Sequence, residues 1–294
     1  MTPSSTQPPE GADHTARLLV SCPDGPGIVA ALSRFLFERG ANIVSSDQYS
    51  THPEHGTFFM RCAFYLPAIE RERNEFEASL GKLAQRFSMT WRLSYASTRR
   101  RVALMASRTE HCLLDVLWRA SRGELEMDIA CVISNHEELR GDVEAFGVQF
   151  LHIPVTAQTK PQAEGAALEV LTGAVDLVVL ARYMQILSGD FLARVGCPVI
   201  NIHHSFLPAF AGAEPYRHAY ERGVKLIGAT AHYVTEQLDE GPIIEQDVVR
   251  VGHHYTVSDL ERVGRDVERM VLARAVRRHL DDRVLVHEGR TIVF

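Results

Sequence analysis

The sequence predicts an α/β protein of two domains, a ferredoxin-like βαββαβ unit followed by a doubly wound, mostly parallel sheet. In residues 15–96, apolar runs and helical spacings follow the order strand, helix, strand, strand, helix, strand. In residues 102–294, short apolar runs alternate with helical patterns, which is typical of a parallel sheet. A length of 294 residues suits two domains that each bury a core. The polar and basic residues 97–101 are interpreted as the linker.

The elements of the first domain follow from the spacing of its apolar residues. Strands are expected at residues 16–21, 42–50, 57–65 and 89–95, with a hairpin turn at residues 52–56. The two helices present apolar faces made of Ile28, Leu32, Phe35 and Leu36, and of Phe76, Leu80, Leu83 and Phe87. Gly40 is expected to end the first helix because glycine adopts the left-handed conformation readily.

The turn after the first strand reads Asp24-Gly25-Pro26-Gly27. With the element order of residues 15–96, it resembles the ACT domain family, whose members often bind small amino acids near this turn. The resemblance implies that Asp24, Gly25 and Gly27 bind an effector. Glycines let a backbone approach a ligand, and the amides of a helix start attract a carboxylate. An equally supported alternative is a tight turn in an oligomerisation module, and a homo-oligomer is expected.

The second domain is expected to contain strands at residues 102–106, 127–134, 150–153 and 175–180, and helices at residues 112–121 and 162–171. Ser258 and Glu261 have the spacing of a capping box, which predicts the start of a long helix. The apolar face of that helix carries Leu260, Val263, Val267, Met270 and Val271. Residues 284–286 and 291–294 predict a terminal hairpin.

Composition excludes several classes of function. The net charge of −6 argues against a nucleic acid or an anionic membrane as the main partner. Apolar runs stay well short of eighteen residues, and residues 1–14 lack the features of a signal peptide and are expected to form a disordered tail. Five scattered cysteines without CxxC spacing fit a reducing cytoplasm rather than a disulfide framework.

The chemistry is expected where two apolar runs end in polar residues. Residues 198–200 lead into Asn201 and His203, and residues 226–234 lead toward Asp239. Side chains two apart in a strand share a face, so an amide and an imidazole would face one space. If both runs belong to one parallel sheet, all three groups lie at the carboxyl ends of its strands. An Asp near the imidazole is expected to raise its pKa.

These groups suit acyl transfer, in which an oxyanion needs a donor and the attacking group needs a base. The alternative for each residue alone is an ordinary turn or surface role. The joint pattern, Asn-Ile-His-His-Ser-Phe-Leu-Pro from Asn201 and Leu-Asp-Glu-Gly-Pro from Leu238, resembles the formyltetrahydrofolate-using formyltransferases. The first motif is similar to that of the formyltetrahydrofolate deformylases in particular. The resemblance implies that Asn201, His203 and Asp239 are catalytic and that 10-formyltetrahydrofolate is the substrate.

The same resemblance implies a folate pocket. Arg182, Met184, Gln185, Ile186 and Leu187 stand in the family's folate-binding loop, where many formyltransferases carry Arg in place of Gln185. The remaining expected lining residues are His232, Thr235, Glu236 and Leu238. Glu214 stands where related sequences commonly carry a basic residue, which would weaken binding of folate carboxylates.

Two further patterns bear on the reaction. The turn at residues 107–112 has no glycine to cradle an acceptor's phosphate, and this absence favours water as the formyl acceptor. His203 and His204 would face opposite ways in a regular strand, and His253 and His254 lack a carboxylate at ligand spacing. A metal site and a cofactor are therefore not expected.

The function expected is hydrolysis of 10-formyltetrahydrofolate to formate and tetrahydrofolate, which serves one-carbon metabolism and purine biosynthesis. Glycine or methionine would be a reasonable effector because each reports one-carbon supply. One alternative is formyl transfer to a small amine, and another is a non-catalytic sensor of amino acids or folate.

Overall fold

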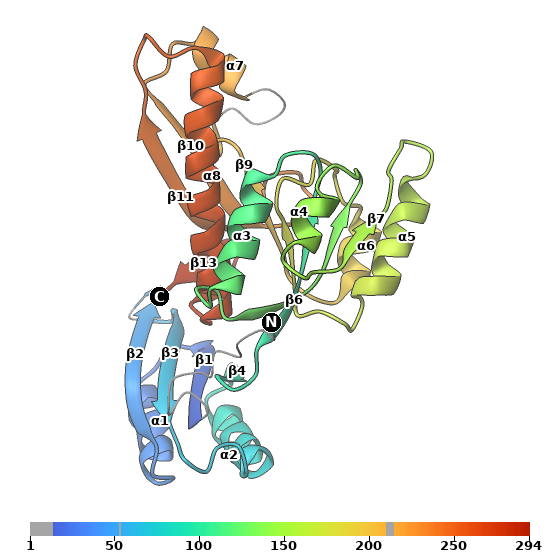
Figure 1. Cartoon of the computed structure of the whole chain (residues 1–294). Coiled ribbons are helices and arrows are strands. Elements are labelled where there is room, and N and C mark those ends of the chain that lie inside the picture. Colours follow the sequence, from blue (N-terminus) through green and yellow to red (C-terminus); the bar gives the residue numbers. More distant parts are fainter. Residues whose placement is uncertain (1–13, 53, 210–214) are drawn as a thin grey trace. The chain divides into compact units, whose positions relative to one another are not determined.

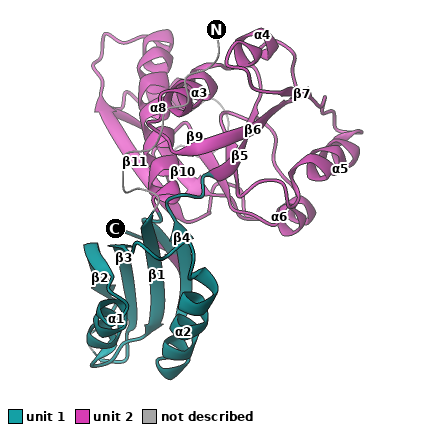
Figure 2. Ribbon diagram, turned by 60° about the horizontal axis from the view of Figure 1, so that its bottom comes forward, with its two compact units in different colours: residues 1–99, 282–285, 292–294 teal, residues 100–281, 286–291 magenta. Residues whose placement is uncertain are grey.

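The computed structural model describes residues 14–52, 54–209 and 215–294 (Figure 1). The chain divides into two compact units (Figure 2). Unit 1 comprises residues up to Arg99 together with Asp282–Leu285 and Ile292–Phe294, and unit 2 comprises Arg100–Asp281 and Val286–Thr291. The expected tail at residues 1–14 lies outside the described residues except for His14.

Unit 1 is a ferredoxin-like βαββαβ fold, as the sequence predicts. Its elements are β1 (Thr15–Pro23), α1 (Ile28–Phe37), β2 (Asn42–Ser50), β3 (Thr57–Tyr65), α2 (Arg73–Arg86) and β4 (Thr90–Tyr95). The sheet order is β2-β3-β1-β4, and the pairs are antiparallel. Both helices pack their apolar residues on one sheet face, where Leu32, Leu36, Leu80 and Phe64 are fully buried. Gly40 has φ +72°, which fits its expected role after the first helix.

A charged cluster ties the carboxyl-terminal segment into unit 1. Asp282 is 1% exposed, and its carboxylate accepts a hydrogen bond from Arg92 at 3.0 Å and faces Arg17 at 3.9 Å. The buried Arg61 on β3 donates to the Asp282 carbonyl at 3.1 Å. Asp282 therefore forms part of the polar interior of the amino-terminal unit.

Unit 2 is a seven-stranded sheet in the order β11-β10-β9-β8-β5-β6-β7. The strands are β5 (Arg100–Ala106), β6 (Met127–Ser134), β7 (Phe150–His152), β8 (Leu177–Leu180), β9 (Val199–His203), β10 (Leu226–Tyr233) and β11 (Ile243–Arg250). The strands from β7 to β9 in this order are parallel, whereas β10 is antiparallel to both β9 and β11. The mostly parallel sheet is confirmed, but the expectation that residues 226–234 run parallel to residues 198–200 is wrong.

Helices cover both faces of this sheet (Figure 1). They are α3 (His111–Ser121), α4 (Arg140–Glu144), α5 (Lys160–Leu171), α6 (Gly189–Val195), α7 (Pro215–Glu221) and α8 (Val257–Leu280). Helices α5 and α6 pack against one face with Leu171 and Phe191, both fully buried. Helix α3 packs against α8, which lies along β9, β10 and β11. With both faces covered, central strands such as Leu177–Leu180 are buried along their length.

Some boundaries differ from the expected ones. Strand β5 begins at Arg100 rather than residue 102, and its pairing with β6 starts there. The capping box of α8 is formed by Thr256 and Asp259, not by Ser258 and Glu261, so the helix starts earlier than expected. The short helices α4, α6 and α7 and strand β11 had no expected counterpart. The terminal hairpin is present as β12 (Val284–His287) and β13 (Arg290–Val293).

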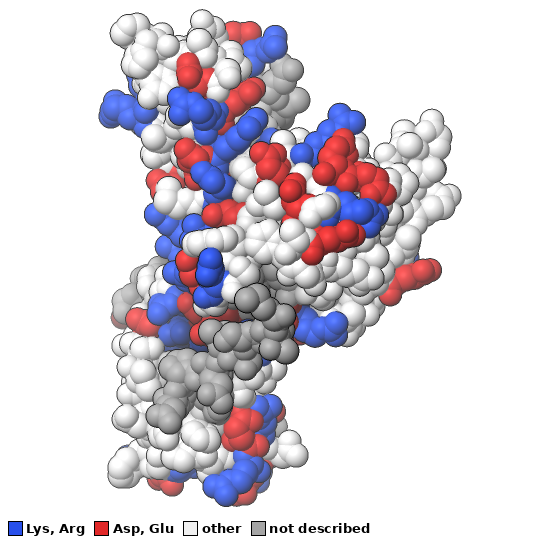
Figure 3. Space-filling view, in the orientation of Figure 1, with Lys and Arg blue, Asp and Glu red and all other residues white. Residues whose placement is uncertain are grey.

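The surface charge and the polarity of the helices bear on whether the protein could bind nucleic acid or cross a membrane. On the face shown in Figure 3, basic and acidic side chains lie intermixed over both units. Among the described residues, every helix is too short or too polar to cross a membrane.

Candidate active site

A cavity of about 500 Å³ opens in unit 2 beside the ends of β8, β9 and β10. Its walls include every catalytic and folate-binding residue expected from the sequence. These are Asn201, His203, Asp239, Arg182, Met184, Gln185, Ile186, Leu187, His232, Thr235, Glu236 and Leu238. The cavity also contains residues that were not expected there, namely Leu180, Tyr183, Ile202, His204, Val234 and Gln237.

Strand register places Asn201 beside His232. The two residues are direct partners across the antiparallel β9–β10 pair, so their side chains share a face. The Nδ1 atom of His232 lies 3.0 Å from the Tyr233 carbonyl, which can only accept, so Nδ1 carries a proton. Nε2 of the same ring lies 3.3 Å from Nδ2 of Asn201. This contact orients the Asn201 amide, whose second N–H remains as a donor.

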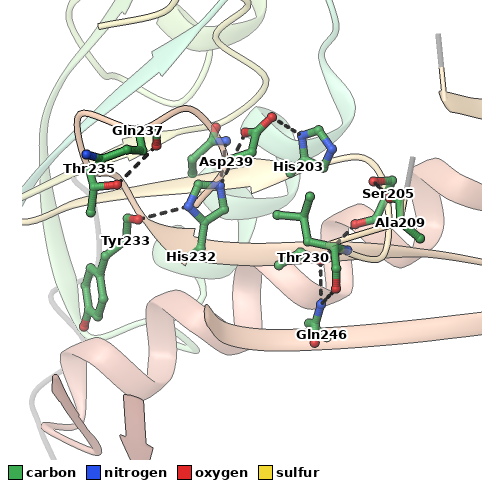
Figure 4. A network of polar contacts seen from close by, with 12 residues as sticks. His203, Ser205, Ala209, Thr230, His232, Tyr233, Thr235, Gln237, Asp239 and Gln246 are labelled. Carbon is green, nitrogen blue, oxygen red and sulfur yellow. Dashed lines mark hydrogen bonds and ion pairs between the residues drawn. The ribbon is translucent and has the colours of Figure 1, made fainter. Parts of the chain in front are cut away.

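The His203 ring and the Asp239 carboxylate face each other (Figure 4). Nδ1 of His203 lies 3.3 Å from Oδ2 of Asp239, and Oδ1 of Asp239 lies 3.7 Å from Nε2 of His232. The carboxylate thus lies between two imidazoles. Nε2 of His203 is buried and has no hydrogen-bond partner among the described residues. This is the arrangement of a general base: the carboxylate orients the ring through Nδ1, and Nε2 is left to take a proton.

The charge states of this pair correct one expectation. Burial lowers the pKa of His203 below its ordinary value of 6.5, and the nearby Asp239 opposes this effect without reversing it. Asp239 raises this pKa as expected, but the net shift is downward, because loss of hydration penalises the charged ring more than one carboxylate favours it. The pKa of Asp239 is lowered, first by the adjacent His232 and further by His203. At neutral pH the site accordingly holds a neutral imidazole and an ionised carboxylate.

The loop that carries Asp239 doubles back on strand β10. Because β10 is antiparallel to β9, its carboxyl end lies beside the start of β9, with Tyr233 opposite Ile200. Residues 234–241 must therefore return along the sheet to bring Asp239 to His203. Asp239 adopts φ +58°, a left-handed conformation that Asp tolerates better than most residues. At Gly241, an added Cβ would lie 1.7 Å from the Tyr233 carbonyl oxygen, so only glycine fits there.

Part of the cavity lining is apolar and partly exposed. Met184 and Ile186 are each 57% exposed and Leu238 is 58% exposed, although these are large hydrophobic side chains. Such a surface suits a flat aromatic ligand. The loop behind it is held by Ser107, whose hydroxyl accepts from the Met184 amide at 3.0 Å and donates to Asn135 at 2.7 Å. Sequence reasoning gave Ser107 no such role.

A buried cluster lies behind Arg182. Glu268 on α8 is 1% exposed and receives hydrogen bonds from His111 at 2.8 Å and Tyr216 at 2.6 Å. The Arg182 guanidinium approaches it at 3.5 Å, and Arg182 itself has φ +64°. The pKa of Glu268 is lowered by His111, Arg182 and Tyr216 despite its deep burial, so it stays ionised.

The described residues include one group with metal-ligand geometry, His111, Cys112 and Glu268. Burial raises the pKa of the Cys112 thiol well above its ordinary value, so this ligand is protonated. Glu268 already pairs with His111, Tyr216 and Arg182. The existing hydrogen bonds account for this arrangement.

The expected effector residues lie in unit 1, at the turn between β1 and α1. The Asp24 carboxylate accepts from the Gly25 amide at 2.8 Å and from the Ser50 hydroxyl at 2.6 Å. Gly27 precedes α1 with φ +91°, and no heavy atom lies within 4 Å of a Cβ built there. Glu214, named in the sequence analysis, lies outside the described residues.

Comparison with known proteins first defines the class. The family described as formyl transferase matches residues 100–276, and the ACT domain family matches residues 16–75. A glycinamide ribonucleotide transformylase from Symbiobacterium toebii is 34% identical, with a TM-score of 0.63 over 67% of this chain and 94% of that chain. The chain is thus an ACT domain joined to a formyltransferase-type domain.

More similar proteins share both domains. Formyltetrahydrofolate deformylases from Mycobacterium tuberculosis and Bacillus subtilis are 61% and 53% identical, covering 95% and 97% of this chain and 90% and 95% of their own. The crystal structure of a formyltetrahydrofolate deformylase from Pseudomonas syringae has a TM-score of 0.91 at 49% identity, covering 95% of this chain and 94% of that one. The chain belongs to the formyltetrahydrofolate deformylase family.

Proposed function

We propose that this chain hydrolyses 10-formyltetrahydrofolate to formate and tetrahydrofolate. The observation that carries the proposal is the meeting of Asn201, His203 and Asp239 in one cavity of a chain that belongs to the deformylase family. An amide donor, a neutral imidazole and a carboxylate are the groups that hydrolysis of a formamide needs.

The proposed reaction begins with a water beside the formyl carbon. Nε2 of His203 takes a proton from this water as its oxygen bonds to the carbon, and Asp239 stabilises the imidazolium that forms. The carbonyl electron pair moves onto oxygen, where the Asn201 amide donates a hydrogen bond. Collapse of the intermediate breaks the bond to N10, and His203 returns the proton to that nitrogen. Formate and tetrahydrofolate are the products.

The rate factors known for such groups are large enough for catalysis by these side chains alone. One oxyanion donor contributes about 10²–10³ in rate, and positioned acid–base catalysis contributes about 10²–10⁴. We therefore assign the chemistry to side chains of this chain, and the proposal includes no metal or other cofactor.

The folate would occupy the apolar side of the cavity. Met184, Ile186, Leu187 and Leu238 would cover the pterin ring, and polar groups from Gln185 and from Thr235, Glu236 and His232 would contact its edge. Arg182 would attract the negative charge that develops on the reacting group. Its guanidinium is supported by Glu268 from within the protein, at 3.5 Å.

Release of formate without another acceptor is the test of this function. The full chain incubated with 10-formyltetrahydrofolate alone should produce formate over many turnovers. An enzyme that transfers the formyl group to a small amine would instead consume 10-formyltetrahydrofolate only when an amine is added, and it would release no formate. A non-catalytic sensor would bind folate or amino acids and give no turnover under either condition.

The remaining parts of the proposal concern regulation and setting. The turn at Asp24, Gly25 and Gly27 would bind an amino-acid effector, glycine or methionine, and the chain would act as a homo-oligomer in the cytoplasm. Support for the effector site comes from the match to the ACT domain family. Formate release measured with and without each amino acid, together with the mass in solution, tests these points.

A further inference from the structure

Three cavities of unit 2 share one side chain, that of His204. It lines the folate cavity described above, a second cavity of about 290 Å³ and a third of about 340 Å³. His204 immediately follows the last residue of β9, so the strict alternation of a strand no longer governs its direction. The expectation that it faces away from the site of His203 is wrong, and the two ring centroids lie 5.2 Å apart.

The second cavity is lined mostly by residues with polar or charged groups and shares two residues with the folate cavity. Its walls include Thr109, His111, Tyr216 and Glu268, and it shares Arg182 as well as His204 with the folate cavity. A space of this size with several polar groups can hold ordered water, because each water finds hydrogen-bond partners there. Because the two cavities share Arg182 and His204, water in the second cavity would lie next to the groups of the folate cavity.

The His204 imidazole is suited to hold such a water. Burial, reinforced by the charge of Arg182, lowers the pKa of His204 to about 3, so the ring is neutral at physiological pH. A neutral imidazole has one donor and one acceptor nitrogen. Ring neighbours are His203 and, at a centroid distance of 6.0 Å, Tyr216, but no described residue hydrogen-bonds to the His204 ring. The ring lines the second cavity, so its nitrogens can serve water held there.

We propose that His204 positions the hydrolytic water between the second cavity and the formyl carbon. This inference rests on the proposed deformylase function and names the residue that makes water the acceptor of the formyl group. The His204 ring accepts a hydrogen bond from the water, whose other proton faces Nε2 of His203. The oxygen bonds to the formyl carbon, His203 takes the transferred proton, and the bond to N10 then breaks as described above. His204 itself gains and loses no proton.

A competing nucleophile separates this role from a general structural one. Hydroxylamine attacks the formyl carbon through its own nitrogen, and the products are formohydroxamate and tetrahydrofolate. It is more nucleophilic than water and does not depend on a hydrogen bond to His204. In a His204→Ala chain, formate release should fall about 10²-fold, the loss associated with a misplaced reacting group. The ratio of formohydroxamate to formate should rise by a similar factor, with KM for the folate nearly unchanged.

Two further variants complete the experiment. His204→Gln keeps a neutral hydrogen-bonding group of similar size, and it should recover part of the formate rate and lower the product ratio. His253→Ala, at an exposed histidine outside the three cavities, is the matched control and should behave as the unmodified chain. The pH at which activity is half-lost on the acid side should be the same for His204→Gln and the unmodified chain.

The outcomes are distinct. Formate and formohydroxamate falling together in His204→Ala, with an unchanged ratio, would overturn the role of His204 and leave hydrolysis standing. Full formate release by His204→Ala would do the same. An unmodified chain that releases no formate from 10-formyltetrahydrofolate would overturn the proposed function and this inference with it. The ratio is measured on soluble protein, so partial loss of folded chain does not affect it.

Discussion

Replacing Asp239 by Asn keeps the shape of the side chain but removes the charge that faces the His203 ring at 3.3 Å. Without that charge, Asp239→Asn cannot stabilise the imidazolium that forms when His203 accepts a proton from water. Acid–base catalysis of this kind contributes about 10²–10⁴-fold. The Asp239 side chain is 13% exposed, so bulk water cannot replace its charge. We therefore expect kcat to fall by about 10³–10⁴, or about 4–5.4 kcal/mol in barrier height.

The assay is formate release at saturating 10-formyltetrahydrofolate, with tetrahydrofolate binding measured by calorimetry. Binding should be retained because the apolar wall around Met184 and Ile186 is untouched. Asp190→Asn, on the exposed surface of α6, is the matched control and should keep full activity.

A double variant tests whether the two groups act as a unit. Asp239→Asn combined with His203→Asn should be about as slow as the slower single variant, because each removes the same proton path. Losses that multiply would contradict the pairing. Retention of full activity by Asp239→Asn alone would remove the carboxylate from the mechanism.

Three other results are expected. Gly241→Ala should lower kcat by roughly 10²-fold, because its Cβ would collide with the Tyr233 carbonyl and shift the Asp239 loop; unchanged kinetics would show that the loop tolerates the change. Glu268→Gln should lower the free energy of unfolding by about 3–5 kcal/mol, measured in urea, because it leaves a buried cation unpaired; an unchanged midpoint would contradict this. In the pH profile of kcat/KM, the acid limb should lie below the ordinary histidine value of 6.5, since the pKa of His203 is lowered. Asp239→Asn should move that limb to still lower pH, because the carboxylate raises this pKa, and a limb above 6.5 would refute the charge states.

The sequence could predict the two folds because each depends on local patterns. Strands β2, β3 and β6 have the bounds expected from their apolar runs. Strand β11 was not predicted because polar residues interrupt the apolar run that indicates a strand. The capping box of α8 was misplaced because Ser258-x-x-Glu261 and Thr256-x-x-Asp259 both satisfy the pattern, and only the backbone decides between them.

Site residues could be predicted as a set, but their arrangement could not. Asn201 and His203 follow from strand alternation, whereas Asp239 reaches them only through a loop that reverses along the antiparallel strand β10. Strand direction is a tertiary property that a single apolar run does not specify. The pKa of His203 depends on how completely neighbours exclude water, which is likewise set by the whole fold. The neighbouring His204 was assigned to the wrong face because alternation stops where the strand ends.

The ties between Asp282 and three arginines of the amino-terminal sheet have a consequence for biosynthesis. During synthesis, the amino-terminal unit lacks the carbonyl that Arg61 uses and the carboxylate that Arg92 and Arg17 face until Asp282 has been added. A graft that ends at residue 96 would leave the buried Arg61 guanidinium without this partner, and a nascent chain must reach residue 282 before its amino-terminal unit has all of these contacts.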